Sequence, residues 1–244
     1  MPDIWTLEQP TARLDLPRLK ARLDLQHPEH GLHALDFRQQ PLAATVELLG
    51  VDLAPASAPT EAYGRQGDLV VSYPGTAEGP LAVQVYWRVN PEETTGRVEI
   101  DLEVSVQTPR LDSDPALSTA SQLPAAQTLR LVDDQMAEFR VLMSAVSSEQ
   151  AVGDPRLPGC WLLRPAGQAW SYAEMVHPAD LNTSEISLCE QGYRLRHRLF
   201  VSRLEKGVIL RARVRGVLLV REDDCALAAA AYHRFVQSPP PLTT

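Results

Sequence analysis

Arginine recurs at every second position in two segments of the chain, the spacing that places side chains on one face of a β-strand. The six residues are Arg194, Arg196, Arg198, Arg211, Arg213 and Arg215. The alternate positions are mostly apolar or small, so each segment is expected to form a strand with one buried face. Because guanidinium groups form paired hydrogen bonds with oxygen-rich partners, a face that carries them is a candidate binding surface.

The four residues 203–206 between the two arginine segments predict a tight hairpin turn. A turn centred on Leu204 and Glu205 would place the three arginines of one strand opposite the three of the other. All six would then share the outer face of residues 193–222. His197 would lie on the inner face against Ala212, and we interpret it as a hydrogen-bonded core histidine rather than a catalytic one.

Residues 97–107 form an acidic counterpart, because their outward positions carry Glu99, Asp101 and Glu103 at the same spacing. The arginines could extend into water, pair with this acidic strand, or contact a ligand. Tyr86 and Arg88 face outward on the preceding predicted strand, residues 81–89. The candidate ligand-binding residues are therefore Arg194, Arg196, Arg198, Arg211, Arg213, Arg215, Glu99, Asp101, Glu103, Tyr86 and Arg88.

Three histidines, His27, His30 and His33, recur every third residue with Glu29 among them. These are suitable ligand types for a metal ion. Pro28 and the glycine at position 31 interrupt any helix that would place the imidazoles on one face. We therefore interpret the segment as a polar turn with solvated histidines and expect no metal site there.

Composition limits the function classes. The 244 residues carry a formal net charge of −8, which argues against general affinity for nucleic acid or anionic membranes. Three widely separated cysteines favour neither a disulfide framework nor a zinc cluster, and they favour a reducing, cytoplasmic location. No signal peptide or membrane-spanning run is recognisable. Phosphate-loop, dinucleotide and zinc-protease motifs are also missing, so no cofactor is expected and any catalytic residue stays unknown.

The order of predicted elements indicates an all-β chain with one helix. Short alternating strands are separated by turns rich in proline and glycine. An aspartate at 223 or 224 is expected to cap a helix at about 224–237, which would pack on the sheets through Tyr232 and Phe235. No boundary divides the chain, so residues 1–244 are predicted to form a single, large antiparallel two-sheet sandwich, similar to a supersandwich, with a C-terminal helix.

Four segments, at residues 68–73, 84–88, 111–115 and 204–216, resemble those of an uncharacterised bacterial protein family. In strand pattern alone, the chain is also similar to galactose-mutarotase-like and carbohydrate-binding β-sandwiches. That resemblance implies a concave sheet face on which arginine, histidine and glutamate contact a sugar. The chain departs from the enzymes because no catalytic pair of histidine and glutamate stands at a recognisable motif.

Three functions follow as hypotheses. The first is a carbohydrate-binding or ligand-recognition module that uses the charged sheet face for a carbohydrate or a small anionic ligand. Exposed aromatic rings would assist it, with Tyr86, Trp170 and Tyr172 as candidates. The second is a mutarotase-type, sugar-modifying enzyme with a histidine and a carboxylate as acid and base. The third is a protein-interaction scaffold. The sequence leaves the oligomeric state open.

Overall fold

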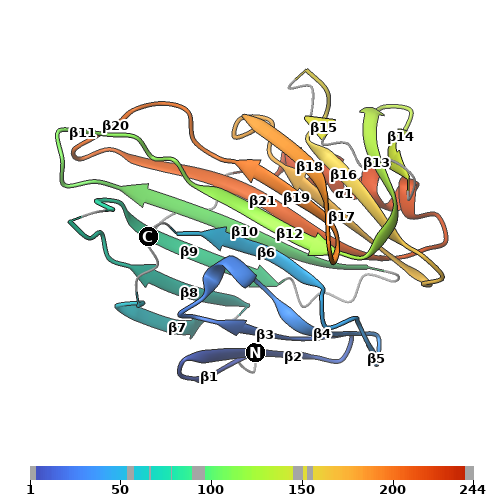
Figure 1. Cartoon of the computed structure of the whole chain (residues 1–244), viewed down its shortest axis with the longest axis horizontal. Helices are drawn as coiled ribbons and strands as arrows, with labels where there is room; N and C mark the ends of the chain where they lie inside the picture. The colour runs from blue at the N-terminus through green and yellow to red at the C-terminus, as the bar shows by residue number, and fades with distance from the viewer. Residues whose placement is uncertain are drawn as a thin grey trace.

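The computed structural model describes residues 4–53, 58–65, 67–77, 79–89, 97–144, 151–152 and 156–239. Within these ranges the regular structure consists of four antiparallel β-sheets, a short 3-10 helix and one α-helix (Figure 1). The turn expected at residues 90–96 lies outside the described residues. The mainly β class and the C-terminal helix predicted from sequence are confirmed.

The largest sheet has nine strands in the order β14-β13-β16-β17-β21-β10-β9-β8-β7. Its strands are β7 (Glu61–Arg65), β8 (Asp68–Tyr73), β9 (Ala82–Val89), β10 (Arg97–Gln107), β13 (Ala125–Asp133), β14 (Glu138–Ser144), β16 (Cys160–Pro165), β17 (Trp170–Val176) and β21 (Ile209–Val220). The central strands β10 and β21 are also the longest, because apolar side chains alternate through 11 and 12 residues.

Two five-stranded sheets and a two-stranded ladder complete the β structure. The second layer has the order β15-β18-β19-β12-β6. Its strands are β6 (Glu47–Asp52), β12 (Ser118–Leu123), β15 (Ala151–Val152), β18 (Thr183–Cys189) and β19 (Gly192–Arg198). The N-terminal sheet contains β1 (Trp5–Glu8), β2 (Thr11–Leu16), β3 (Leu19–Asp24), β4 (His33–Phe37) and β5 (Gln40–Pro41). The ladder pairs β11 (Asp112–Ser113) with β20 (Leu204–Glu205).

The main core lies between the nine-stranded sheet and the two five-stranded sheets. Trp87, Leu102 and Val214 of the large sheet belong to the same buried cluster as Leu195 of β19 and Leu23 of β3. Burial of these apolar faces removes them from water, which is the dominant favourable term in folding. The alternate side chains of β9, β10 and β21 consequently point to the outer face of the nine-stranded sheet.

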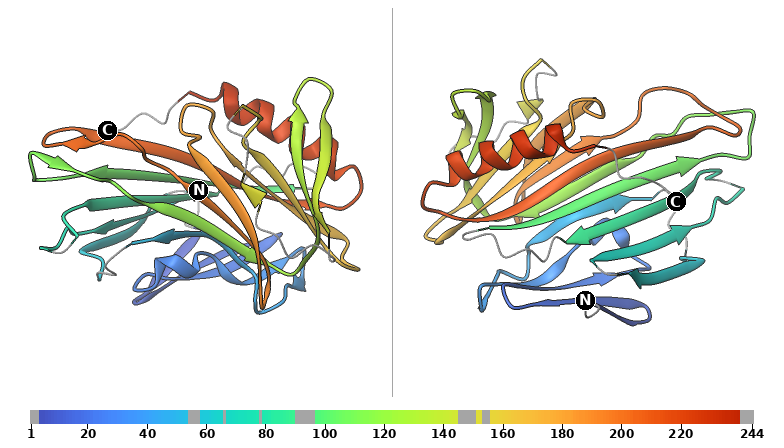
Figure 2. Two further views of the ribbon diagram at one scale, coloured as in Figure 1. Left: turned by 45° about the horizontal axis from the view of Figure 1, so that its top comes forward. Right: turned by 180° about the vertical axis from the view of Figure 1, so that it is seen from behind.

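Helix α1 (Asp224–Gln237) covers one end of that outer face, over β16, β17 and β21 (Figure 2). The outer face of β21 becomes apolar at Val217 and Leu219, and these residues form a second core cluster with Tyr232 and Phe235. The predicted capping mechanism is wrong. Asp223 is the N-cap residue, but its backbone is in the left-handed conformation and its side chain makes no capping hydrogen bond. The neighbouring Asp224 instead accepts hydrogen bonds from Arg164 and Ser171.

The hairpin predicted for the two arginine strands is also wrong. β19 pairs with β12 and β18, whereas β21 pairs with β10 and β17, so the strands belong to different sheets. The alternation ends at Leu199 and Phe200, which are both buried, while Val201 is exposed. The chain therefore leaves the second layer there and crosses to the large sheet. His197 faces Thr119 and Ser184 rather than Ala212.

Candidate functional site

Two cross-strand rows of polar residues line the outer face of the nine-stranded sheet where α1 does not cover it. Arg88 of β9, Asp101 of β10 and Arg215 of β21 are direct neighbours across the sheet. The next row contains Tyr86, Glu103 and Arg213 in the same order of strands. The alternative in which the arginines pair with the acidic strand is realised closely for Arg215, whereas the nearest carboxylate to Arg213 belongs to Asp180, at 3.7 Å. Opposite charges face each other across neighbouring strands, which favours this register.

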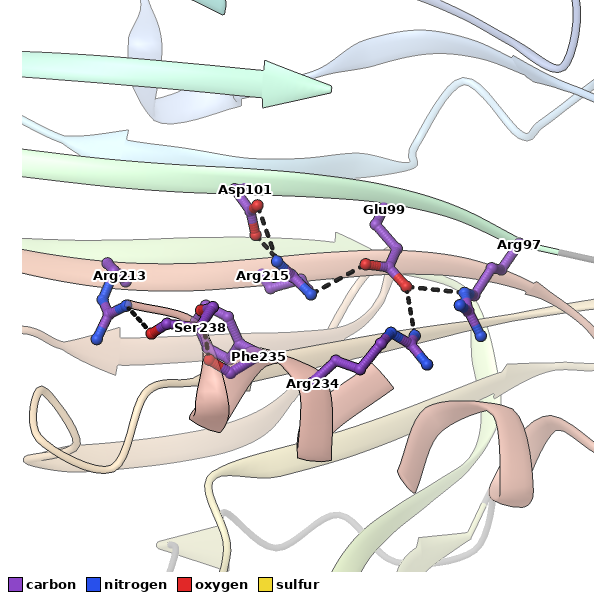
Figure 3. A network of polar contacts seen from close by, with 8 residues as sticks. All are labelled: Arg97, Glu99, Asp101, Arg213, Arg215, Arg234, Phe235 and Ser238. Atoms are coloured by element: carbon purple, nitrogen blue, oxygen red, sulfur yellow. Dashed lines mark hydrogen bonds and ion pairs between the residues drawn. The ribbon is translucent and has the colours of Figure 1, made fainter. Parts of the chain in front are cut away.

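Arg215 is held by carboxylates on two sides (Figure 3). Its Nε and Nη2 donate to Asp101 at 2.5 and 2.9 Å, and its Nη1 donates to Glu99 at 2.9 Å. The side chain is only 11% exposed. Burial opposes the charge, but the hydrogen bond to Asp101 and the two carboxylates raise the pKa of Arg215 above its usual value. This guanidinium is thus charged and fixed in one orientation.

Glu99 also connects the sheet to the helix. Its carboxylate accepts from Arg234 in the last turn of α1 at 2.7 Å and forms an ion pair with Arg97 at 2.8 Å. The C-terminal end of α1 is further fixed by Arg213, whose Nη1 donates to the carbonyl of Ser238 at 3.1 Å. The guanidinium groups of Arg213 and Arg215 both lie over the ring of Phe235, and Cζ of Arg215 is 4.8 Å from the ring centroid. The helix end therefore forms a wall beside the polar rows.

Glu103 differs from the other carboxylates of this face. It is only 8% exposed, and its one ion-pair contact among the described residues is with Arg211, at 3.9 Å. Burial raises the pKa of Glu103 above its usual value, although nearby arginines act in the opposite direction. A carboxylate that is partly desolvated and weakly paired retains lone pairs for a ligand hydroxyl or a proton.

These side chains surround a pocket of about 400 Å³ on the outer face. It is lined by Tyr86, Arg88, Asp101, Leu102, Glu103, Arg213, Arg215, Phe235, Ser238 and Pro239. The volume lies within the range of small-molecule sites, and the lining combines aromatic rings with a few fixed polar groups, as such sites do. An adjoining hollow of about 270 Å³ is lined in part by Arg211.

The eleven residues predicted from sequence are thus divided between two faces. Six line the pocket, Glu99 supports it and Arg211 borders it. Arg194, Arg196 and Arg198 lie on the outer face of the second layer, where all three are exposed. Arg196 forms an ion pair with Asp52 there, at 2.8 Å.

Sequence reasoning missed the contribution of the helix end. Phe235 was predicted to pack α1 on the sheets, which it does, but it also lines the pocket with Ser238 and Pro239. Of the three aromatic candidates, only Tyr86 lines the pocket, since Trp170 and Tyr172 belong to the main core between the sheets. The available signal was the change from arginine to Val217 and Leu219 on β21, which marks where the outer face becomes covered.

A histidine and a carboxylate do meet in this chain, but inside the core. Nε2 of His197 lies 2.9 Å from Oε1 of Glu174, outside hydrogen-bond geometry, and Nδ1 of His197 is 2.7 Å from the hydroxyl of Ser184. Oε2 of Glu174 accepts from Tyr172 at 2.5 Å and from Ser121. Burial and the charge of Glu174 raise the pKa of Tyr172 well above its usual value. As expected, His197 is a buried core residue.

Comparison with known proteins shows the fold alone. No family model and no curated protein sequence matches the chain. Among solved structures, a TPR-domain-containing protein from Parabacteroides distasonis superposes with a TM-score of 0.62 at 6% identity, over 96% of this chain and 49% of its own length. The chain therefore spans about half of that protein. No described helix is long and apolar enough to cross a membrane.

Two further structures have names that refer to sugar chemistry. A protein assigned as an aldose 1-epimerase from Klebsiella pneumoniae has a TM-score of 0.61 at 8% identity, with 96% of this chain and 87% of that chain covered. The galactosidase domain of the α-galactosidase–sucrose kinase AgaSK has a TM-score of 0.51 at 8% identity, covering 87% of this chain and 41% of that one. The chain has a fold similar to the aldose epimerase and carbohydrate-active enzyme domains, the mutarotase-like supersandwich predicted from the strand pattern.

Proposed function

We propose that the pocket at the end of α1 binds a small carbohydrate. The observation that carries the proposal is the convergence of Tyr86, Glu103, Arg213 and Phe235, from three strands and a helix, on one cavity of about 400 Å³. Aromatic surfaces suit the C–H faces of a sugar ring, and fixed donors and acceptors suit its hydroxyls. The fold shared with sugar-modifying proteins supports the same ligand class.

The charge balance favours a hydroxyl-rich ligand over a simple anion. Arg88 is paired with Asp68 through two hydrogen bonds of 2.6 and 2.7 Å, and Arg215 is paired with Asp101. Neutralised guanidinium groups attract a phosphate weakly, but their remaining N–H groups still donate hydrogen bonds. Glu103 would also repel an anion. The pocket therefore offers both hydrogen-bond donors and acceptors rather than an electrostatic potential that is positive throughout.

Of the two carboxylates that line the pocket, Glu103 is more weakly paired than Asp101 and therefore has more capacity to accept from a sugar. As an acceptor it would receive a ligand hydroxyl proton, and Arg213, its neighbour across the strands, would donate to the adjacent oxygen. Both side chains are positioned by regular strands before any ligand arrives, which lowers the ordering cost of binding. Tyr86 lies on the other side of Glu103 and lines the same pocket.

Calorimetric titration of the full chain with a panel of neutral and anionic mono- and disaccharides tests the proposal, with Arg196→Ala as the matched control. Glu103→Gln and Arg213→Ala should each weaken binding by about 10-fold or more, since a hydrogen bond to a charged group contributes about 1.5–3 kcal/mol. Arg196→Ala, which changes an exposed arginine of the other layer, should leave affinity unchanged. Equal losses in all three variants, or no saturable binding by wild type, would refute the proposal.

The raised pKa of Glu103 favours a second candidate, a mutarotase-type activity in which this carboxyl exchanges a proton with a sugar hydroxyl. Among the described residues that line the pocket there is no histidine, so a histidine acid would have to come from elsewhere. Polarimetry of anomer interconversion distinguishes the candidates. Catalysis by wild type that is abolished in Glu103→Gln supports the enzyme, whereas sugar binding without interconversion supports the recognition module.

A further inference from the structure

A short turn far from the pocket gathers metal-ligating side chains. The 3-10 helix Pro28–His30 joins β3 to β4 and, together with its N-cap residue His27, brings the side chains of His27, Glu29 and His30 close to one another. One ligand atom from each residue lies within 4.8 Å of the others. The Nδ1 of His27 lies 3.2 Å from Oε1 of Glu29, and the ring centroids of the two histidines are 6.0 Å apart. Pro28 was expected to keep these side chains apart, but it is the first residue of the 3-10 helix that brings them together.

The backbone of this turn is fixed against β6. Leu32 and Leu48 exchange two backbone hydrogen bonds, of 2.7 and 2.9 Å. Gly31 has a φ of +58°, and a Cβ at this position would lie 2.2 Å from the carbonyl oxygen of Leu48. A Cβ on Gly50 would lie 2.1 Å from the carbonyl oxygen of Glu29. Only glycine allows this close approach, so the sequence builds a rigid base under the three side chains.

A second carboxylate orients one of the imidazoles. Oε1 of Glu47, at the start of β6, lies 3.0 Å from Nδ1 of His30. A carboxylate on one ring nitrogen fixes the tautomer that leaves the other nitrogen free to bind a metal, an arrangement common around metal-ligating histidines. Glu47 also adds negative charge beside a cation. His33, the third histidine of the repeat, does not belong to this close group of ligand atoms, and its Nδ1 faces the carbonyl oxygen of Gly31 at 3.2 Å.

We propose that His27, Glu29 and His30 bind a divalent transition-metal ion such as Zn²⁺, with Glu47 as the positioning residue for His30. Two imidazoles and one carboxylate are a ligand set that Zn²⁺ accepts, and water would complete the coordination. Bonds of about 2.0–2.2 Å require the ligand atoms to move inward from their present separation, which half-exposed side chains can do by rotation. The three residues provide nitrogen and oxygen ligands and no sulfur, so the set does not favour Cu(I), which selects sulfur ligands.

Calorimetric titration of the untagged full chain with ZnCl₂ at pH 7.5 tests the site. Wild type should bind one equivalent, and its melting temperature should rise with Zn²⁺, because an ion that binds only the folded state stabilises it. His27→Ala and His30→Ala should each weaken binding by about 100-fold or more, whereas Glu47→Ala should weaken it by about 10–100-fold. His33→Ala is the matched control and should bind as wild type does.

Cobalt provides a second readout that does not depend on the heat of binding. Co²⁺ held by the two imidazoles should give visible absorption bands that His27→Ala and His30→Ala abolish and His33→Ala retains. Melting curves without metal verify that each variant folds, as the half-exposed positions of both rings predict. No saturable Zn²⁺ binding, or binding that persists unchanged in both variants or disappears equally in His33→Ala, would overturn the proposal.

Discussion

The two arginine strands have the same sequence pattern but opposite structural roles. On β21, Arg215 is 11% exposed and contacts two carboxylates and an aromatic ring. On β19, Arg196 is 45% exposed and contacts Asp52. Period-two spacing determines which face a side chain occupies, but the neighbouring strands determine whether the charge is fixed or solvated. Only the first arrangement gives a preorganised surface.

The neighbours differ because the strands lie in different layers. β21 lies beside β10, whose outward positions carry Glu99, Asp101 and Glu103, and beside the end of α1. The three outward arginines of β19 lie between β12 and β18, opposite serine, alanine and glutamine on β12 and opposite threonine, serine and a single glutamate on β18. A face with few carboxylates leaves long cationic side chains in water, where an ion pair contributes little. We therefore place the ligand site on the nine-stranded sheet.

The largest expected effect concerns the group that joins the two layers. Glu174 of β17 reaches His197 of β19 and Ser121 of β12 from the other side of the core. Glu174→Ala would leave these buried polar groups without their partner and should lower the free energy of unfolding by about 3–5 kcal/mol. Urea denaturation at pH 7 measures the change. Glu174→Gln, which keeps the shape, should cost less, and a loss below about 1 kcal/mol in Glu174→Ala would show that the layers are not held here.

The second prediction compares the two arginine strands directly. Arg215→Ala leaves Asp101 and Glu99 partly buried without their shared cation, so it should destabilise the protein by about 3 kcal/mol. Arg196→Ala removes an exposed pair and should cost about 0–1 kcal/mol. Parallel urea titrations measure both values. Similar losses in the two variants would contradict the distinction drawn between the faces.

Sequence reasoning reached the fold because alternation is a local signal. Trp87 and Val104 point inward as their positions in period two require, and the helix covers residues 224–237 as predicted. Pairing between distant strands is not local. The short link between the two arginine strands favoured a hairpin, whereas the chain crosses between layers where the two consecutive apolar residues Leu199 and Phe200 interrupt the alternation and are both buried.

The candidate site was predictable only in part for the same reason. The outward residues of β9, β10 and β21 were identified because each strand displays its own alternation. Phe235 could be assigned to the helix but not to a pocket, since its place depends on where α1 crosses the sheet. Glu174 lies in β17, which is buried on both faces. Burial does not alternate along this strand, so the sequence pattern does not single out Glu174.

The smallest predicted effect is a pH dependence of the helix end that borders the pocket. Nε2 of His177 donates to the carbonyl of Val236 at 3.2 Å, and its Nδ1 accepts from the backbone N–H of Ala179. Both bonds together require a neutral ring. Burial and the charge of Arg213 lower the pKa of His177, and the hydrogen bond to Val236 and the charge of Asp180 oppose them with smaller effects.

A histidine with a lowered pKa in the folded state contributes stability that is present above its unfolded pKa of about 6.5. This contribution disappears as the pH falls through that value toward the folded pKa, because the unfolded chain binds the proton more readily. Wild type should therefore lose stability between pH 7.5 and 5.5, and His177→Gln should reduce that slope. Urea titrations at several pH values measure it, with His233→Gln as the control. If the dependence of stability on pH is unchanged in His177→Gln, protonation of His177 does not affect this end of the nine-stranded sheet. The fixed ion pairs of β21 would then be the main difference between this face and the face of β19.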